Sequence, residues 1–190
     1  MCSWVITITG GKLHRPSSLR SRSPPPLHHT PHHTPRYAPH CPFVKLLKDA
    51  LVALAREYAP RGVRILAVVS SSLETHPQDG PAALVEEAGA LGNPFPFLFD
   101  ETQAVAKAFM AACTPEFYVF DGAGTLQYHG QACDARPKKD PPDVPTCADL
   151  RAALDDVLAG RPVGRPQKRA LGCNIKFTPG NEPDYFAASF

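Results

Sequence analysis

Cys41 is the residue of this 190-residue sequence whose type and position best suit chemistry. Pro42 follows it directly, and proline is favoured at the first position of a helix, so Cys41 is predicted to cap a helix. The free N–H groups and the dipole at a helix N-terminus stabilise an anion. A cysteine there has a depressed pKa, and its thiolate is the form that attacks peroxides and disulfides. His40 is expected either to add positive charge beside this thiolate or to lie exposed without a role.

The other cysteines carry no comparable local signal. The sequence holds six in all: Cys2, Cys41, Cys113, Cys133, Cys147 and Cys173. No two of them have the close spacing that a zinc ribbon requires. A disulfide scaffold is not expected in a chain of this length without a secretory signal. They are therefore predicted to be either reactive or simply buried thiols.

Helices and strands alternate after Cys41. Apolar residues at helical spacing predict a helix from 42 to about 59, and the apolar run at 63–70 predicts a buried strand. The later patterns predict a helix at 81–90, a strand at 95–99, a helix at 100–110, a strand at 116–120, its hairpin partner at 125–129 and a helix at 146–160. This order predicts an α/β domain of three layers.

Two of these helices begin with a predicted capping box. Asp100 precedes Gln103 by three residues, and Thr146 precedes Asp149 by the same spacing. In such a pair, each side chain bonds a free N–H group near the start of the helix. Asp100 and Thr146 are therefore predicted to be the N-caps.

The N-terminal part of the sequence has a composition of its own. The first 48 residues hold eight prolines, six histidines, seven Lys or Arg and no acid. The stretch 15–39 has almost no aliphatic residues and is predicted to be disordered or loosely extended. The histidine cluster at 28–33 is not expected to form a metal centre, since nothing nearby supports its ligands. We expect low complexity over 1–39, a domain over 40–160, and a tail over 161–190 that packs on the domain.

Composition also limits the class of protein. The net charge is only +2, which argues against a nucleic-acid partner, and no apolar run is long enough for a membrane span. A secretory signal is missing, so a cytoplasmic or organellar (chloroplast or mitochondrial) location is expected. The Arg- and Ser-rich start resembles an organelle transit peptide. The alternatives are a low-complexity extension without a function and a mispredicted gene start. Phosphate-binding glycine loops and the GxSxG motif are absent.

Several segments resemble a known family in their order and spacing. HCPFVK, NPFPFLFDETQAVAKAF, AACTPEFYVFDGAG and GCNIKFTPGNEPDYF are similar to the thioredoxin-family, peroxiredoxin-like proteins of the alkyl hydroperoxide reductase and thiol-specific antioxidant group. The resemblance covers about residues 40–186 and implies a thioredoxin-like fold with thiol redox activity. It also implies that Thr114-Pro115 is the cis-proline loop facing Cys41, which would bring Cys113 close. A cis bond before proline costs only ~0.5–1 kcal/mol.

Two features depart from the family pattern. The family motif reads like Cys-Asn-His-Cys-Pro, whereas Ala38 stands in place of its first cysteine. Cys41 would therefore exchange with Cys113, Cys173 or an external thiol. The prolines ahead of Cys41 also exclude a central strand there. That strand is predicted to be missing or replaced, and Trp4–Thr9, with its β-branched alternation, is the candidate to fill the vacancy.

The favoured function is a thiol oxidoreductase that reduces peroxides or disulfides without a cofactor or metal. An external thiol of the thioredoxin or glutathione type would recycle it. The alternatives are a redox-inactive thioredoxin-like binding module, which lost its activity with the missing cysteine, and a mispredicted fragment. The catalytic candidates are Cys41, Cys113 and Cys173, and the substrate-binding candidates are His40, Thr114, Pro115 and Arg136. Arg136 either pairs with a substrate anion or is a solvated charge.

Overall fold

The computed structural model describes residues 2–8, 41–137 and 143–187. No helix within these ranges is long and apolar enough to cross a membrane. The elements in chain order are β1 (Cys2–Ile8), α1 (Pro42–Tyr58), the 3₁₀ turn η1 (Ala59–Arg61), β2 (Val63–Val69), the 3₁₀ turn η2 (Pro77–Asp79), α2 (Pro81–Ala90), β3 (Phe97–Phe99), α3 (Ala104–Ala108), β4 (Cys113–Thr114), β5 (Phe117–Phe120), β6 (Leu126–Gly130), α4 (Ala148–Leu158), β7 (Cys173–Asn174) and α5 (Asp184–Ala187).

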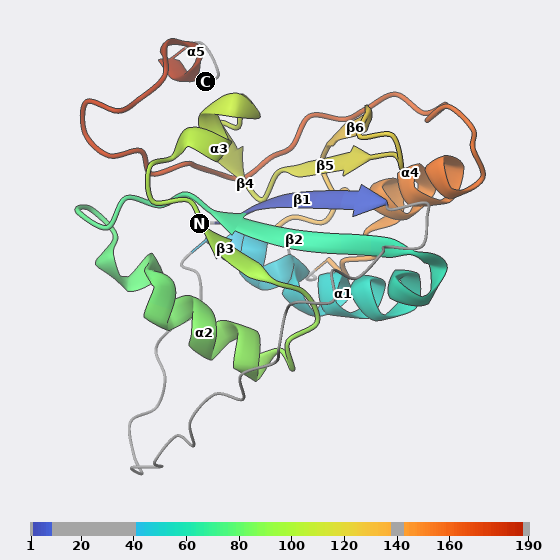
Figure 1. The fold of residues 1–190 in the computed structure, drawn as a ribbon, viewed down its shortest axis with the longest axis horizontal. Helices are drawn as coiled ribbons and strands as arrows, with labels where there is room; N and C mark the ends of the chain where they lie inside the picture. Colours follow the sequence, from blue (N-terminus) through green and yellow to red (C-terminus); the bar gives the residue numbers. More distant parts are fainter. Residues whose placement is uncertain (1, 9–40, 138–142, 188–190) are drawn as a thin grey trace, which may run out of the picture.

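A five-stranded sheet in the order β3-β2-β1-β5-β6 forms the middle layer (Figure 1). β2 and β3 run parallel, and β5 and β6 form the predicted antiparallel hairpin. A separate two-stranded sheet joins β4 to β7. The sequence gives no sign of this small sheet, because two-residue strands have no measurable period.

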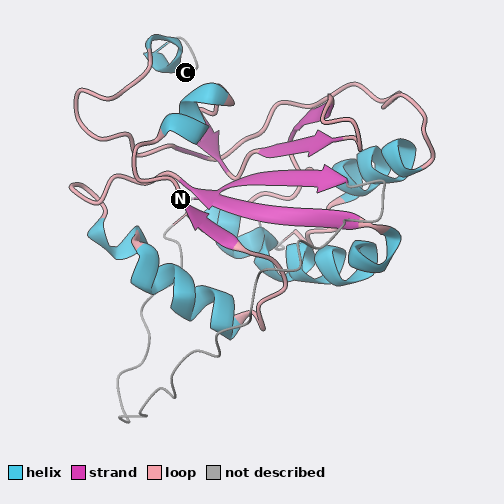
Figure 2. Cartoon of the chain, viewed as in Figure 1, coloured by secondary structure: helices cyan, strands magenta, loops and turns pink. Residues whose placement is uncertain are grey.

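Helices cover both faces of the large sheet (Figure 2). On one face, α1, α2 and α4 pack on the alternate buried residues of β2 and β5. On the other face, α3 and the C-terminal segment share a second apolar cluster with β2 and β5, formed by Val68, Ala106, Ala111, Tyr118, Ile175 and Phe177. The chain thus has the three-layer, thioredoxin-like α/β fold predicted from its sequence.

β1 replaces the strand that is missing before Cys41, but it runs in the opposite direction. A strand leading straight into α1 would lie parallel to β2, as in a βαβ unit. Instead β1 is antiparallel to β2, with Cys2 opposite Val69 and Ile8 opposite Val63. On its other side it is parallel to β5. The prediction that the N-terminal strand fills the vacancy is confirmed, and the strand's direction is a property that only the sheet reveals.

The capping box predicted at the start of α3 is wrong in part. The residue before the helix is Gln103, in the left-handed region with φ 61°. Its side-chain amide donates to the Ser70 carbonyl at 2.8 Å, and its side-chain oxygen accepts from the Thr178 N–H rather than from an N–H at the helix start. Asp100 nevertheless accepts from the Val105 and Ala106 N–H groups. The side chain of Asp100 therefore caps the helix. The helix begins at Ala104, however, which is later than a capping box starting at Asp100 would place it.

The capping box predicted for α4 is also wrong. The N-cap is Cys147, at φ 53°, and no side chain caps this helix. The Ala132 carbonyl accepts from the Asp149 and Leu150 N–H groups instead. A backbone carbonyl from the β6–α4 loop thus takes the place of the Thr146 hydroxyl.

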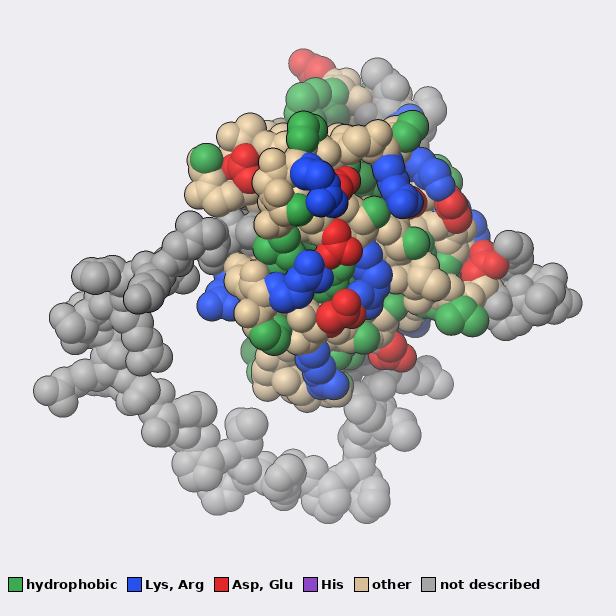
Figure 3. Space-filling model, turned by 90° about the vertical axis from the view of Figure 1, so that its right-hand side faces the viewer, with side chains coloured by type: hydrophobic (Ala, Val, Ile, Leu, Met, Phe, Trp, Pro, Cys, Tyr) green, Lys and Arg blue, Asp and Glu red, His purple; other side chains and the backbone are tan. Residues whose placement is uncertain are grey.

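Lys and Arg side chains are mixed with Asp and Glu on the face of the molecule that Figure 3 shows. Ion pairs link α1 and η1 to α4. Arg61 lies 2.7 Å from Asp155, and Arg151 pairs with Glu57. The Arg61 guanidinium also lies 4.4 Å from the centre of the Tyr58 ring. Exposed pairs of this kind contribute little stability each, so we regard this region as a solvated face.

Candidate active site around Cys41

Cys41 occupies the N-cap of α1, as the sequence predicted. Its backbone is extended, with φ −64° and ψ 116°, and Pro42 begins the helix. The Cys41 carbonyl accepts the first helical hydrogen bond from the Lys45 N–H at 3.1 Å. No side chain caps α1, so the N–H groups of its first turn are available to the sulfur.

The Thr114–Pro115 bend lies directly against this sulfur. The peptide bond between the two residues is cis, which the family resemblance had implied. The Cys41 thiol donates to the Thr114 carbonyl oxygen at 3.1 Å. The helix that starts at residue 42 and the bend at 114–115 therefore meet at one atom, across 73 residues of sequence.

The C-terminal segment completes the site. Cys173 pairs with Thr114 in the β4–β7 ladder, and it packs with Phe43 on the apolar cluster of Cys41 and Val44. This ladder continues through the hydrogen bond between the Ile175 N–H and the Ala112 carbonyl. The structure therefore unites Cys41, Thr114 and Cys173, which lie far apart in the sequence.

Gly172 is what allows this close approach. A Cβ atom on Gly172 would lie 1.9 Å from the Thr114 carbonyl oxygen and 2.4 Å from its carbonyl carbon. Both are backbone atoms of the bend, so neither can move aside as a flexible side chain would. No local signal in the sequence distinguishes Gly172, because only the fold brings it against the bend.

The sulfurs of Cys41 and Cys173 differ in acidity. Burial is the largest influence on Cys41 and raises its pKa. Hydrogen bonds from the Thr114 side chain, the Val44 backbone and both the backbone and the thiol of Cys173 outweigh that effect, so the pKa of Cys41 is lowered. Burial, followed by the hydrogen bond and the charge of Cys41, raises the pKa of Cys173 to about 11. The pair is therefore suited to hold one thiolate and one thiol.

Access to the two sulfurs also differs. Cys41 is only 1% exposed, whereas Cys173 is partly exposed. A solute reaches the Cys41 sulfur only if the covering residues move. β7 is one of these covers, and it consists of two residues held to β4.

Cys113 lies near the cluster but is turned to other partners. Its thiol donates to the Ala170 carbonyl at 3.6 Å, and no hydrogen bond to Cys41 is present among the described residues. Burial raises the pKa of Cys113 to about 12, and the charge of Glu116 adds to this effect. Cys113 is therefore protonated at neutral pH and is a poor nucleophile.

The remaining predicted site residues are His40 and Arg136. His40 and the histidine cluster at 28–33 lie outside the described residues. The Arg136 guanidinium donates to the carbonyls of Cys133 and Ala135 and to the side chain of Gln131. These bonds hold the loop between β6 and α4 together. Within the described ranges, no three His, Cys, Asp or Glu side chains are grouped as metal ligands.

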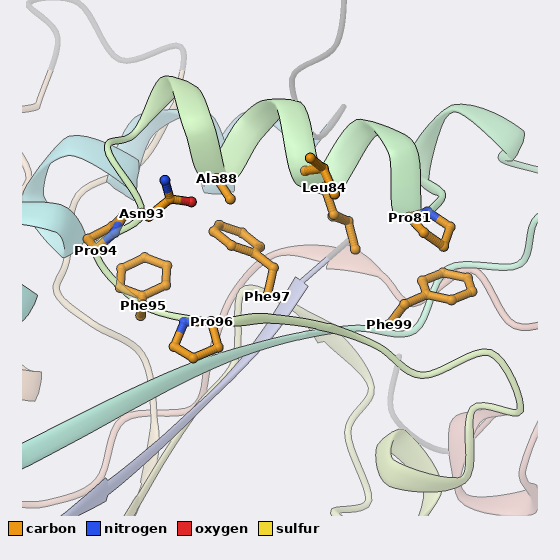
Figure 4. A pocket seen from close by; sticks show the side chains of 10 residues that line it. Pro81, Leu84, Ala88, Asn93, Pro94, Phe95, Pro96, Phe97 and Phe99 are labelled. Carbon is orange, nitrogen blue, oxygen red and sulfur yellow. The ribbon is translucent and has the colours of Figure 1, made fainter. Parts of the chain in front are cut away.

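An apolar groove of about 520 Å³ lies between α2 and β3 (Figure 4). Leu84, Phe95, Phe97 and Phe99 are among the residues that line it. None of its lining residues belongs to the cluster of Cys41, Val44 and Cys173. The groove is therefore separate from the thiol chemistry.

Comparison with known proteins agrees with this geometry. The model of the AhpC/TSA family matches residues 36–129, which include Cys41 and the Thr114–Pro115 bend. A solved structure of a hypothetical protein from Sinorhizobium meliloti 1021 is 37% identical, covering 93% of this chain and 80% of that chain with a TM-score of 0.70. An uncharacterized conserved protein from Geobacillus kaustophilus is 39% identical over 94% of this chain and 78% of that chain, with a TM-score of 0.71. No curated protein matches. On the family match and these two relatives, the chain belongs to the AhpC/TSA family.

Proposed function

We propose that this protein is a thiol-dependent antioxidant oxidoreductase in which the Cys41 thiolate attacks a peroxide or a disulfide. One observation carries the proposal: the Cys41 sulfur sits at the N-terminus of α1, and its pKa is lowered by hydrogen bonds from Thr114, Val44 and Cys173 despite burial. Stabilising the thiolate raises the fraction of the form that reacts at neutral pH.

With a peroxide, the first step would oxidise Cys41 to a sulfenic acid. The thiolate attacks the terminal peroxide oxygen, an S–O bond forms and the O–O bond breaks. Two electrons pass from sulfur to the peroxide. The departing alkoxide or hydroxide takes a proton from solvent and leaves as an alcohol or water. With a disulfide substrate, the same thiolate would instead form a mixed disulfide and release a thiolate.

Cys173 is the best-placed partner for the second step. Its sulfur would attack the Cys41 sulfenic acid to form a disulfide, while its thiol proton and the departing hydroxide leave together as water. The charge of Cys41 contributes to the raised pKa of Cys173, and that charge disappears once Cys41 is a sulfenic acid. Cys173 thus becomes easier to ionise when it is needed.

An external thiol of the thioredoxin or glutathione type would then reduce the Cys41–Cys173 disulfide. One thiolate of the reductant attacks a sulfur of the pair, forms a mixed disulfide and releases the other sulfur as a thiolate. A second thiolate of the reductant then attacks the mixed disulfide and releases the remaining sulfur, so the reductant leaves as a disulfide and supplies the two electrons. Cys173 is the more exposed sulfur of the pair and is the expected point of attack. The cycle needs no bound cofactor.

The decisive experiment is the rate of alkylation of each cysteine as a function of pH, read by peptide mass spectrometry on the full chain. Cys41 is expected to react with a midpoint below the free value of about 8.5, because its thiolate is stabilised. Cys113 and Cys147, whose pKa values are raised to about 12 by burial, are expected to stay unreacted through that range. The urea-unfolded chain, in which all sites are alike, is the control.

A Cys41 midpoint at or above the free value would contradict the proposal. A second contradicting result would come from treatment with a slight excess of peroxide. In that result, no cysteine of the folded protein is oxidised faster than in the unfolded protein. In that event a redox-inactive thioredoxin-like binding module becomes the better account of this protein.

A further inference from the structure

Glu116 is a buried carboxylate beside the site that the proposed chemistry does not use. It follows Pro115 directly, and the residue is 6% exposed. Its Oε2 atom accepts from the Ala112 N–H at 3.1 Å, and its Oε1 atom lies 2.6 Å from His129 Nε2 on β6. A buried charge is kept only where hydrogen bonds replace its hydration, so these two contacts fix the carboxylate in place.

The contact with Ala112 closes a ring around the bend. The segment Ala112–Glu116 contains Cys113, Thr114 and Pro115, and the Glu116 side chain reaches back across it to the N–H at its start. Ala112 is fixed through its carbonyl as well, which accepts from the Ile175 N–H at 3.0 Å. Ala112 is thus held by the carboxylate and by the C-terminal segment at once.

The contact with His129 fixes this ring to the sheet. The His129 ring stacks on Tyr118, with ring centres 4.3 Å apart and planes 15° apart. Tyr118 lies on β5 and His129 on β6 at paired positions. Glu116 therefore connects the start of the bend to the hairpin of β5 and β6.

We infer that Glu116 is a positioning residue that holds the Thr114–Pro115 segment against the Cys41 sulfur. No contact between Glu116 and Cys41 is recorded among the described residues. Glu116 acts through Thr114, whose carbonyl lies 3.1 Å from the Cys41 sulfur and whose side chain lowers the pKa of Cys41 by hydrogen bonding. The inference rests on the proposed function, since the placement matters for chemistry only if Cys41 reacts. The effect of Glu116 on the position of the bend can nevertheless be tested separately from the activity.

The test is the alkylation rate of Cys41 in three variants of the full chain. Glu116→Ala removes the acceptor, and we expect Cys41 to react about tenfold more slowly at neutral pH, the equivalent of one unit of pKa. Glu116→Gln keeps an oxygen that accepts from Ala112, so its rate is expected to stay within about twofold of the unmodified chain. Glu116→Met fills a similar volume without an acceptor and should follow the alanine variant.

Glu87→Ala is the matched control. Glu87 is also 6% exposed, and its ion pair with Lys48, at 3.8 Å, lies on α2 away from the thiol cluster. Removing it also deletes a buried carboxylate, so any general loosening of the fold appears there too. The Cys41 rate and its pH midpoint are expected to be unchanged in this control, after urea unfolding has been measured for every variant.

Equal Cys41 rates in Glu116→Ala, Glu116→Met and Glu87→Ala would overturn the inference, and would show that the β4–β7 ladder alone holds the bend. If Glu116→Ala does not fold, the comparison of the methionine and glutamine variants decides the question. The proposed function fails separately, through an ordinary pKa for Cys41 in the unmodified chain. The effect of Glu116 on the alkylation rate is readable in either case.

Discussion

Replacing Cys41 by serine is expected to abolish peroxide turnover, with a loss of roughly 10³-fold or more, as when a catalytic nucleophile is removed. The hydroxyl keeps the size of the side chain and can still donate to the Thr114 carbonyl. It does not ionise at neutral pH, so the N-terminus of α1 has no thiolate to stabilise. Peroxide consumption with a dithiol reductant measures the effect, and circular dichroism confirms that the variant folds.

The two other cysteines of the site provide matched controls for that variant. Cys113→Ser should retain turnover, because the Cys113 thiol is buried, protonated and bonded to the Ala170 carbonyl. Cys173→Ser should still be oxidised once at Cys41 but should accumulate a sulfenic acid, which dimedone traps. Full turnover by Cys41→Ser would refute the assignment of the nucleophile. If Cys113→Ser fails to form a disulfide while Cys173→Ser still forms one, Cys113 and not Cys173 is the partner of Cys41.

Gly172→Ala is expected to have a large effect on both the stability and the site, because the added methyl group has no room. The new Cβ atom would lie 1.9 Å from the Thr114 carbonyl oxygen and 3.1 Å from the Pro115 nitrogen. Because the obstacle is backbone, β7 must move off β4, which separates Cys173 from Cys41. We expect the free energy of unfolding to fall by about 1–3 kcal/mol or more, as for overpacked interiors, and the Cys41–Cys173 disulfide to fail to form.

Urea unfolding and peptide mapping after peroxide treatment measure these two effects. Gly164→Ala is the control within the same C-terminal segment, since nothing lies within 4 Å of the position a Cβ would take. It should leave both the unfolding free energy and the disulfide unchanged. If Gly172→Ala forms the disulfide as readily as the unmodified chain, the close contact between β7 and the bend is not what positions Cys173.

Local patterns were enough to predict the frame of the domain. α1 and β2 were found from apolar spacing alone, and α2 was predicted with its observed bounds. The place of Cys41 at a helix N-terminus followed from the proline after it, which is a strictly local rule. The capping boxes of α3 and α4 failed because carbonyls and carboxylates from other parts of the chain satisfy those helix ends.

The sequence by itself determined the α/β class and the helix that follows Cys41, because each depends on neighbouring residues. The bend at Thr114–Pro115 was implied by the family resemblance, and its cis bond is a finding of the structure. Only the tertiary structure decided that β1 runs backwards through the centre of the sheet, since strand direction depends on partners and not on composition. It also decided that the thiol of Cys173, rather than that of Cys113, hydrogen-bonds to the Cys41 sulfur, and that Glu116 closes the bend. Those contacts join residues that are far apart in the sequence. No local pattern relates such residues, so only the packing of the folded chain brings them together.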